Sequence, residues 1–145
     1  MKNIHAVTGA FGYTGKYISN LLLSENQKVI TLTNSTNRNN EFNNIIKAFP
    51  FNFDNTKELI RNLDNVKVLY NTYWVRFNHK LFNHSVAVEN SKKLFDAAKE
   101  AGVEKIVHVS ITNPSINSHL EYFRGKAILE DYLQKIGRAS CRERV

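Results

Sequence analysis

Three glycines lie at three-residue intervals in the segment TGAFGYTG, residues 8–15. A short apolar run precedes this segment, and residues 12–24 have the apolar spacing of an amphipathic helix. At such a strand-to-helix junction, Gly9 permits a tight turn, Gly12 lets the backbone approach a diphosphate, and Gly15 lets the helix pack closely on the sheet. The start of the helix also offers free N–H groups and a positive dipole end to phosphates. The segment therefore predicts nucleotide binding, with a purely structural turn as the alternative.

Apolar strand-like runs and helical segments alternate along most of the chain. This alternation predicts a parallel sheet with helices on both faces, and right-handed crossovers give the doubly wound arrangement. We therefore expect an α/β fold of the Rossmann type, with five strands in the spatial order 3-2-1-4-5 and a ligand crevice at the carboxyl ends of strands 1 and 4. The expected strands span 3–8, 27–33, 47–53, 66–70 and 104–111, and the expected helices span 12–24, 55–63, 85–101 and 119–135.

The composition is that of one globular domain. The chain has 145 residues, 42% of them hydrophobic and 23% charged, which is enough for one hydrophobic core and too few for two domains. The net charge is +7, but the basic residues are scattered, which favours solvated helix faces over a nucleic-acid surface. No apolar run reaches the ~18 residues of a membrane span, and no signal peptide fits before the first strand. We expect a cytoplasmic protein with no nucleic-acid partner and no membrane span.

The last ten residues, IGRASCRERV (136–145), differ from the rest of the chain. They hold three arginines and the single cysteine, Cys141, and they resemble the translation of a sequencing adapter. We therefore expect a nucleotide-binding domain at 1–135, incomplete at its C-terminus and truncated before the substrate region, followed by a non-native tail. A genuine basic tail is the alternative. Without a further strand, residues 104–111 form an open apolar edge, which predicts a marginal or self-associating chain.

The glycine spacing and three later segments resemble one superfamily, the short-chain dehydrogenases/reductases, in its extended and atypical branches. The later segments are YNTYWVRF (70–77), AVENSKKLFDAAKEAGVEKIVHVSITNPS (87–115) and YFRGKAILEDYL (122–133), and the resemblance covers essentially all of 3–135. These branches include nucleotide-sugar epimerases, NmrA-like proteins and the 39-kDa-like accessory subunit of respiratory complex I. The resemblance implies the NAD(P)-binding part of an oxidoreductase or epimerase-like enzyme with an unknown small-molecule substrate. A non-catalytic NAD(P)-sensing regulator or accessory subunit is the alternative.

The end of the second strand bears on the choice of dinucleotide. NAD sites usually place an acidic residue there for the ribose hydroxyls, whereas this chain has Thr33, Asn34 and Ser35. Arg38 is the nearest basic residue, and a guanidinium is able to meet a 2′-phosphate with a forked contact. A solvated loop arginine is the alternative. We expect NADP, with NAD as the second possibility.

The resemblance implies cofactor roles beyond the glycine segment. It places Asp54, after the third strand, at the adenine amino group, although an acid that serves the dipole of the next helix is the alternative. Asn71 and Thr72, at the end of the fourth strand, are expected to line the ribose and diphosphate. Trp74 and Phe77 either border the substrate pocket or form a packed aromatic loop. The expected cofactor-binding residues are Gly9, Phe11, Gly12, Tyr13, Thr14, Gly15, Asn34, Arg38, Asp54, Asn71, Thr72 and Lys126.

Tyr122 and Lys126, four residues apart, share one face of the helix after the fifth strand. In the resembled superfamily such a tyrosine transfers a proton, and the lysine favours its phenolate form and hydrogen-bonds the nicotinamide ribose. A serine or threonine at the end of the preceding strand orients the substrate carbonyl, and Ser110 or Thr112 fits that role. We expect Ser110, Tyr122 and Lys126 as the catalytic set. Because chance also produces the four-residue spacing, a solvated helix face is the alternative for Tyr122 and Lys126.

The five histidines predict no metal site. His79 and His84 are five residues apart, which is not the spacing of two ligands on one helical face. His5 and His108 lie in expected strands, where hydrogen-bonded core histidines are more common than metal ligands.

Overall fold

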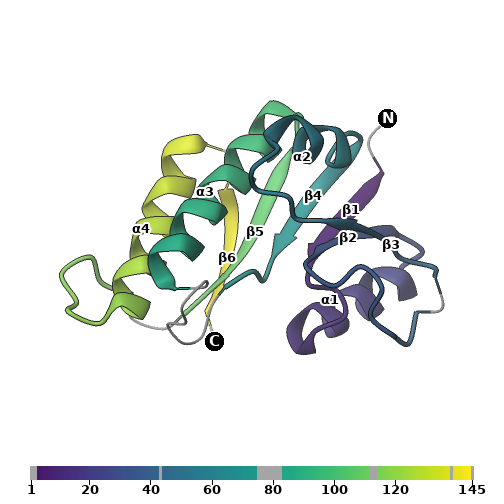
Figure 1. Ribbon diagram of the computed structural model, residues 1–145, viewed down its shortest axis with the longest axis horizontal. Coiled ribbons are helices and arrows are strands. Elements are labelled where there is room, and N and C mark those ends of the chain that lie inside the picture. The colour runs from purple at the N-terminus through teal and green to yellow at the C-terminus, as the bar shows by residue number, and fades with distance from the viewer. Residues whose placement is uncertain (1–2, 43, 75–82, 112–113, 138, 145) are drawn as a thin grey trace.

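The computed structural model describes residues 3–42, 44–74, 83–111, 114–137 and 139–144. These residues form one six-stranded sheet with helices on both faces (Figure 1). Three residues discussed above, Phe77, His79 and Thr112, lie outside the described residues.

Every strand and helix expected from the sequence is present, with ends that agree to within a few residues. The third strand is shorter than expected because it ends at Pro50, a residue without an N–H to continue the ladder. The elements are β1 (Ile4–Thr8), α1 (Tyr13–Ser24), β2 (Lys28–Thr33), β3 (Lys47–Pro50), α2 (Thr56–Asn62), β4 (Val66–Asn71), α3 (His84–Glu100), β5 (Lys105–Ser110), α4 (Glu121–Ile136) and β6 (Ala139–Arg144).

The strands are all parallel and lie in the order β3-β2-β1-β4-β5-β6. The predicted order 3-2-1-4-5 and the predicted Rossmann-type α/β fold are therefore confirmed. The chain runs outward from β1 in one direction and from β4 in the other, so the carboxyl ends of β1 and β4 meet at the switch point. In open α/β sheets, ligands bind in the crevice at this point.

The expectation that β5 is an open edge is wrong. Strand β6 comes from the C-terminal tail and pairs in parallel with β5 along its length. Gly137 turns the chain back after α4, with a φ of 78° in the left-handed region. Because a β-ladder joins backbone groups, a segment extends a sheet largely irrespective of its side chains. The non-native origin of 136–145 stays a prediction.

The two faces of the sheet bury two separate clusters. Helices α2, α3 and α4 cover one face over the larger cluster, and α1 covers the other (Figure 1). The larger cluster includes Leu32, Leu59, Leu69, Leu94, Phe95, Ile106 and Leu129, and the smaller one includes Val7, Phe11, Val29 and Phe42.

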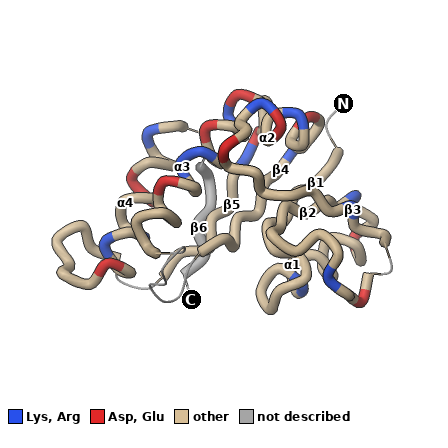
Figure 2. The backbone as a smooth tube through the Cα atoms, in the orientation of Figure 1, with Lys and Arg blue, Asp and Glu red and all other residues tan. Residues whose placement is uncertain are grey.

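Charged residues of both signs alternate along the outer helices. Figure 2 shows basic and acidic positions side by side on α2 and α3. Within the described ranges, none of the helices combines the length and the apolar character needed to pass through a bilayer.

Candidate functional site

The glycine segment turns the chain from β1 into α1. Gly9 has a φ of 64°, which glycine adopts without strain, and its N–H donates to the carbonyl of Leu32 in β2 at 2.9 Å. The Gly12 N–H donates to the Gly9 carbonyl at 2.9 Å and closes the turn. A Cβ at Gly15 would lie 2.1 Å from the Gly9 oxygen, so a larger residue there displaces the helix. The turn thus brings the bare backbone of the segment to the start of α1.

The N-terminus of α1 lacks the side-chain cap found on two other helices. Asn55 Oδ1 accepts from the Glu58 N–H at 3.2 Å to begin α2, and Asn83 Oδ1 accepts from the Val86 N–H at 2.8 Å to begin α3. Helix α1 begins after Gly12, with no capping side chain and no acidic residue in its first turn. Its first N–H groups are therefore left for a ligand.

An open cavity of about 530 Å³ lies in front of this turn, at the carboxyl edge of the sheet. Three of the residues that line it, Phe51, Tyr73 and Trp74, had no cofactor role predicted. Phe51 was obscured because 47–53 has the pattern of an unbroken strand, whereas Tyr73 and Trp74 directly follow a predicted site segment. Seven predicted cofactor residues line the cavity: Gly9, Gly12, Tyr13, Thr14, Gly15, Asn34 and Thr72.

Five predicted cofactor residues lie outside this lining: Phe11, Arg38, Asp54, Asn71 and Lys126. Phe11 is buried on the α1 side, where its ring lies 6.3 Å from that of Phe42. Arg38 and Asp54 are exposed, and Arg38 lies in a separate polar hollow of about 330 Å³ formed by the loop after β2. The structure thus gathers the residues of the glycine turn and leaves these two charged groups at the surface.

A buried hydrogen-bond chain joins β1, β4 and β5 beneath the cavity. Thr8 Oγ1 donates to Asn71 Oδ1 at 3.1 Å, and Asn71 Nδ2 donates to His108 Nδ1 at 3.1 Å. The Thr72 N–H donates to Thr8 Oγ1 at 2.8 Å, and Thr72 Oγ1 donates to the Thr8 carbonyl at 2.6 Å. Because Asn71 is fully buried, it acts on the cavity by fixing Thr72, which lines it.

Lys126 lies inside the protein, so the alternative of a solvated helix face does not hold for this residue. The residue is only 4% exposed. Its Nζ donates to the Val109 carbonyl at 3.1 Å and lies 4.4 Å from the centroid of the Trp74 ring. Burial lowers the pKa of Lys126 to about 8, and the charge of Glu130 acts in the opposite direction. A lysine with such a pKa is able to hold or release a proton near neutral pH.

Tyr122 and Ser110 lie near Lys126 without a hydrogen bond that links the three. The Tyr122 ring meets Trp74 and His84 edge-on, with centroids at 5.9 Å and 5.6 Å. Ser110 ends β5, is 2% exposed, and its Oγ has no partner among the described residues. All three predicted catalytic residues belong to the end of β5 and the start of α4, but none of them lines the cavity.

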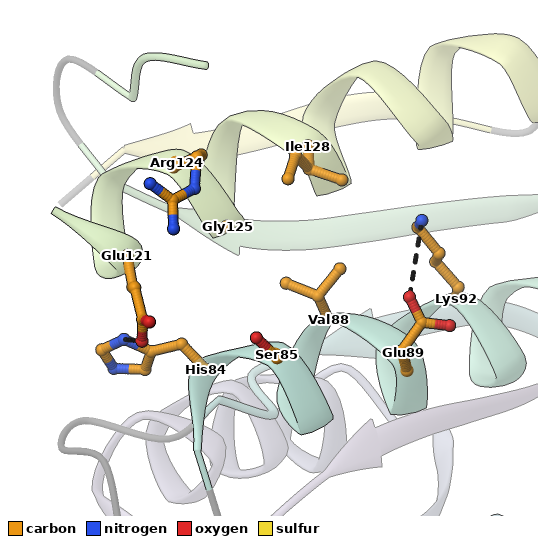
Figure 3. Close-up of a pocket in the computed structure, with 9 residues that line it drawn as sticks. All are labelled: His84, Ser85, Val88, Glu89, Lys92, Glu121, Arg124, Gly125 and Ile128. Carbon is orange, nitrogen blue, oxygen red and sulfur yellow. Dashed lines mark ion pairs between the residues drawn. The ribbon is translucent and has the colours of Figure 1, made fainter. Parts of the chain in front are cut away.

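A second hollow lies between α3 and α4 (Figure 3). It has a volume of about 220 Å³ and no predicted cofactor or catalytic residue on its walls. At one end His84 Nδ1 lies 3.8 Å from Glu121 Oε2, and at the other Lys92 pairs with Glu89 at 3.7 Å. Gly125 lies on the α4 side of this hollow.

A family model described as the NAD dependent epimerase/dehydratase family matches residues 5–113. The chain belongs to this family. The match runs from β1 to the end of β5, so it contains the glycine turn and Ser110 and stops before Tyr122. The predicted resemblance to the extended short-chain dehydrogenases/reductases is confirmed.

The chain is similar in sequence to a mitochondrial oxidoreductase subunit and similar in fold to several solved structures. It is 28% identical over 136 residues to the mitochondrial NADH-ubiquinone oxidoreductase 40 kDa subunit of Neurospora crassa, covering 90% of this chain and 36% of that protein. Among solved structures, MoeE5 in complex with UDP-glucose and NAD is 16% identical with a TM-score of 0.73, over 94% of this chain and 52% of that one. The triphenylmethane reductase of a Citrobacter species, complexed with NADP(H), is 15% identical with a TM-score of 0.72, over 94% and 47%. The solved structures show the shared fold, and the chain spans about half their length or less.

Proposed function

We propose that the chain binds a nicotinamide dinucleotide, as the cofactor-binding part of a larger oxidoreductase or nucleotide-sugar epimerase-like enzyme. The observation that carries this proposal is the bare glycine turn at the mouth of the cavity. A Cβ added at Gly15 would lie 2.1 Å from the Gly9 oxygen, and a Cβ added at Gly12 would lie 3.3 Å from it. A diphosphate in the cavity accepts hydrogen bonds from the uncapped N–H groups at the start of α1, where the helix dipole also favours negative charge.

The rest of the cavity suits the adenosine half of the ligand. The rings of Phe51 and Tyr73 lie 5.1 Å apart and both line the cavity, which gives an apolar wall for the adenine. Thr8 takes both the N–H and the hydroxyl proton of Thr72, so Thr72 Oγ1 is left as an acceptor for a ribose hydroxyl. Asp54, exposed before α2, is the acceptor that we propose for the adenine amino group.

NADP is the dinucleotide that we propose for this site. Asn34 lines the cavity, and no carboxylate is among the described lining residues to accept hydrogen bonds from the ribose hydroxyls. Arg38 follows four residues later in the same loop, and its exposed guanidinium is the group that we propose for the 2′-phosphate. Solved structures that share the fold bind either dinucleotide, as MoeE5 does NAD and the Citrobacter reductase does NADP(H).

The chemistry that we propose for the parent enzyme divides between ligand and protein. A bound nicotinamide supplies or accepts the hydride. The Tyr122 hydroxyl gives or takes the proton, the Lys126 ammonium favours the phenolate, and Ser110 Oγ donates a hydrogen bond to a carbonyl. The buried Oγ of Ser110, which has no partner among the described residues, supports the last role.

A second candidate function is a non-catalytic dinucleotide sensor or accessory subunit. The observation that favours it is the position of Trp74, whose ring covers Lys126 on the side of the cavity. The complex I subunit among the relatives is consistent with this alternative. The two candidates differ in whether Tyr122 and Lys126 reach the dinucleotide.

Titration of NADPH fluorescence with the 145-residue chain tests binding. Gly12→Glu places a side chain and a negative charge where the diphosphate is expected, so the dissociation constant should rise at least about tenfold. Asn20→Glu is the matched control, because Asn20 is exposed on the same helix away from the cavity. Equal affinities for the two variants would contradict the proposed site.

Cofactor absorbance of the full-length parent protein, in the presence of carbonyl or nucleotide-sugar substrates, separates the two candidates. Turnover that is lost in Tyr122→Phe supports the enzyme. Tight NADPH binding without turnover, unchanged in Tyr122→Phe, supports the sensor or accessory subunit.

A further inference from the structure

Trp74 belongs both to the cavity wall and to the surroundings of the predicted catalytic pair. It lines the cavity just after β4. Its ring also lies 4.4 Å from Lys126 Nζ and meets the Tyr122 ring edge-on at 5.9 Å. On the α3 side the indole stacks on His84, with centroids 5.8 Å apart and planes 12° apart. One side chain thus separates the cavity from α4.

The backbone of α4 is shaped to receive this indole. A Cβ at Gly125 would lie 2.9 Å from Trp74 Cη2 and 3.1 Å from Val88 Cγ2, so the ring edge occupies the space of the missing side chain. A glycine inside a helix costs about 1 kcal/mol relative to alanine. Here that cost accompanies a close fit of the ring against the helix. Gly125 therefore keeps the indole directly beside Lys126.

The indole also completes the environment of the Lys126 ammonium. Nζ has the Val109 carbonyl on one side and the face of Trp74 on another, and the side chain is almost fully buried. An aromatic face attracts a desolvated cation. Trp74 Nε1 is itself buried without a partner among the described residues, so the ring is held by packing and by the cation.

We propose that Trp74 is the positioning residue for Lys126: its indole holds the ammonium against Val109 and keeps it out of the dinucleotide cavity. A ligand in the cavity contacts Lys126 only after the indole leaves Gly125. This proposal deepens the proposed function, on which the identity of the cavity ligand rests. The shielding of Lys126 by Trp74 stands on the contacts of the chain alone.

The groups around Lys126 define what a titration reports. Glu130 of α4 acts on it by charge, and its own charge acts in turn on the neutral His108 of β5. Tyr122 and His84 both contact the indole that covers it. Burial lowers the pKa of Lys126 to about 8 from the ordinary value of 10.5. Loss of the indole admits water to the ammonium, which moves the pKa back toward the ordinary lysine value.

Acetylation of the chain with acetic anhydride across a pH series, quantified for each lysine by mass spectrometry, tests the proposal. In the wild-type chain we expect Lys126 to react with a midpoint near pH 8. In Trp74→Ala the midpoint should rise by about one pH unit or more, because the gain in hydration outweighs the lost attraction of the ring for the cation. The limiting rate at high pH should rise at least about fivefold. Trp74→Phe, which keeps an aromatic face, should restore most of the wild-type profile.

Two controls separate positioning from a general loss of packing. Lys16 lies 5.4 Å from the exposed ring of Tyr17, so Tyr17→Ala removes an aromatic face from another lysine and should leave the Lys126 profile unchanged. Circular dichroism checks that Trp74→Ala is folded. Unchanged midpoint and limiting rate in a folded Trp74→Ala chain would overturn the proposal.

The emission of Trp74 gives a second measurement that needs no change at this residue. The chain has one tryptophan, so its fluorescence reports this indole alone. We expect a pH-dependent change in emission with a midpoint near 8 that disappears in Lys126→Met. An identical titration in Lys126→Met would overturn the proposal even if Trp74→Ala does not fold.

The NADPH arm distinguishes this proposal from the proposed function. NADPH should protect Lys126 from acetylation more strongly in Trp74→Ala than in the wild-type chain, because the indole no longer stands between them. A chain that does not bind NADPH but shows a shielded Lys126 contradicts the dinucleotide site and leaves the role of Trp74 in place. If the chain binds NADPH but Lys126 is no more reactive in Trp74→Ala than in the wild type, the dinucleotide site is supported and the role of Trp74 is contradicted.

Discussion

Asn71 Nδ2 donates a hydrogen bond to His108 Nδ1 at 3.1 Å, and both side chains are buried between β4 and β5. An amide nitrogen only donates, so Nδ1 of the imidazole is the acceptor and the ring proton lies on Nε2. His108 is therefore neutral in the folded protein. Burial, aided by the charge of Lys126, lowers its pKa to about 3.

This neutral histidine predicts that the fold weakens in mild acid. The pKa of His108 is lower in the folded state than its ordinary value of 6.5, so its contribution is fully present above pH 6.5 and is lost as the pH falls toward about 3. Each pH unit in that window costs about 1.4 kcal/mol, which amounts to about 2 kcal/mol between pH 7 and pH 5. Urea unfolding at the two pH values measures this loss.

His108→Gln should reduce the acid-dependent loss, because glutamine stays neutral and still accepts a hydrogen bond from Asn71. His119→Gln, at an exposed position, is the matched control. An equal loss of unfolding free energy in both variants would show that His108 is not the group responsible.

We predict that Gly15→Ala destabilises the protein, because the glycine turn is tightly packed. The added Cβ would meet the Gly9 oxygen at 2.1 Å and the Ala10 Cα at 3.0 Å, both in the backbone, so α1 has to move. Such overpacking costs about 1–3 kcal/mol of unfolding free energy, and it displaces the N–H groups proposed to hold the diphosphate. Thermal and urea unfolding measure the first effect, and NADPH titration measures the second. Asn20→Ala should change neither, and a Gly15→Ala chain as stable as that control would contradict the packing.

We predict that Asn34→Asp shifts the preference of the chain from NADPH toward NADH. Asn34 lines the cavity at the end of β2, where a carboxylate accepts hydrogen bonds from the ribose hydroxyls and repels a 2′-phosphate. We expect the ratio of NADH to NADPH affinity to rise at least about tenfold, and Arg38→Ala to weaken NADPH while it leaves NADH nearly unchanged. Fluorescence titrations with both dinucleotides give the ratio. A wild-type chain that prefers NADH would refute the assignment to NADP.

Local signals in the sequence were sufficient for the first five strands and the four helices, but not for β6. The glycine turn, the asparagine at the start of α2 and Gly102 after α3 act over a few residues, so each marks an element boundary directly. The alternation of strands and helices then leaves few topologies for a parallel sheet. For the same reason the sequence pointed to most of the cavity lining, because the ends of β1, β2 and β4 meet at one edge.

Contacts between distant residues were beyond the reach of these signals. The indole of Trp74 lies over Lys126, 52 residues later in the chain, and no local pattern records that contact. Asn71 has the sequence position of a cavity residue, but Thr8 and His108 bury its amide. Side-chain direction at a strand end depends on the neighbouring strands, so the sequence alone did not show that the Asn71 amide points away from the cavity.

We predict that the chain self-associates when β6 is removed. In the full chain β6 pairs with β5, whereas a chain that ends at Gly137 leaves the backbone groups of β5 exposed along an edge. Such an edge is a template for pairing with a second copy. Light scattering should therefore show a concentration-dependent increase in mass for 1–137 relative to 1–145. As a control, Val107→Lys in 1–137 places a charge on a half-buried strand position and should reduce the association. Equal masses for 1–137 and 1–145 across concentrations would show that β6 does not protect the edge.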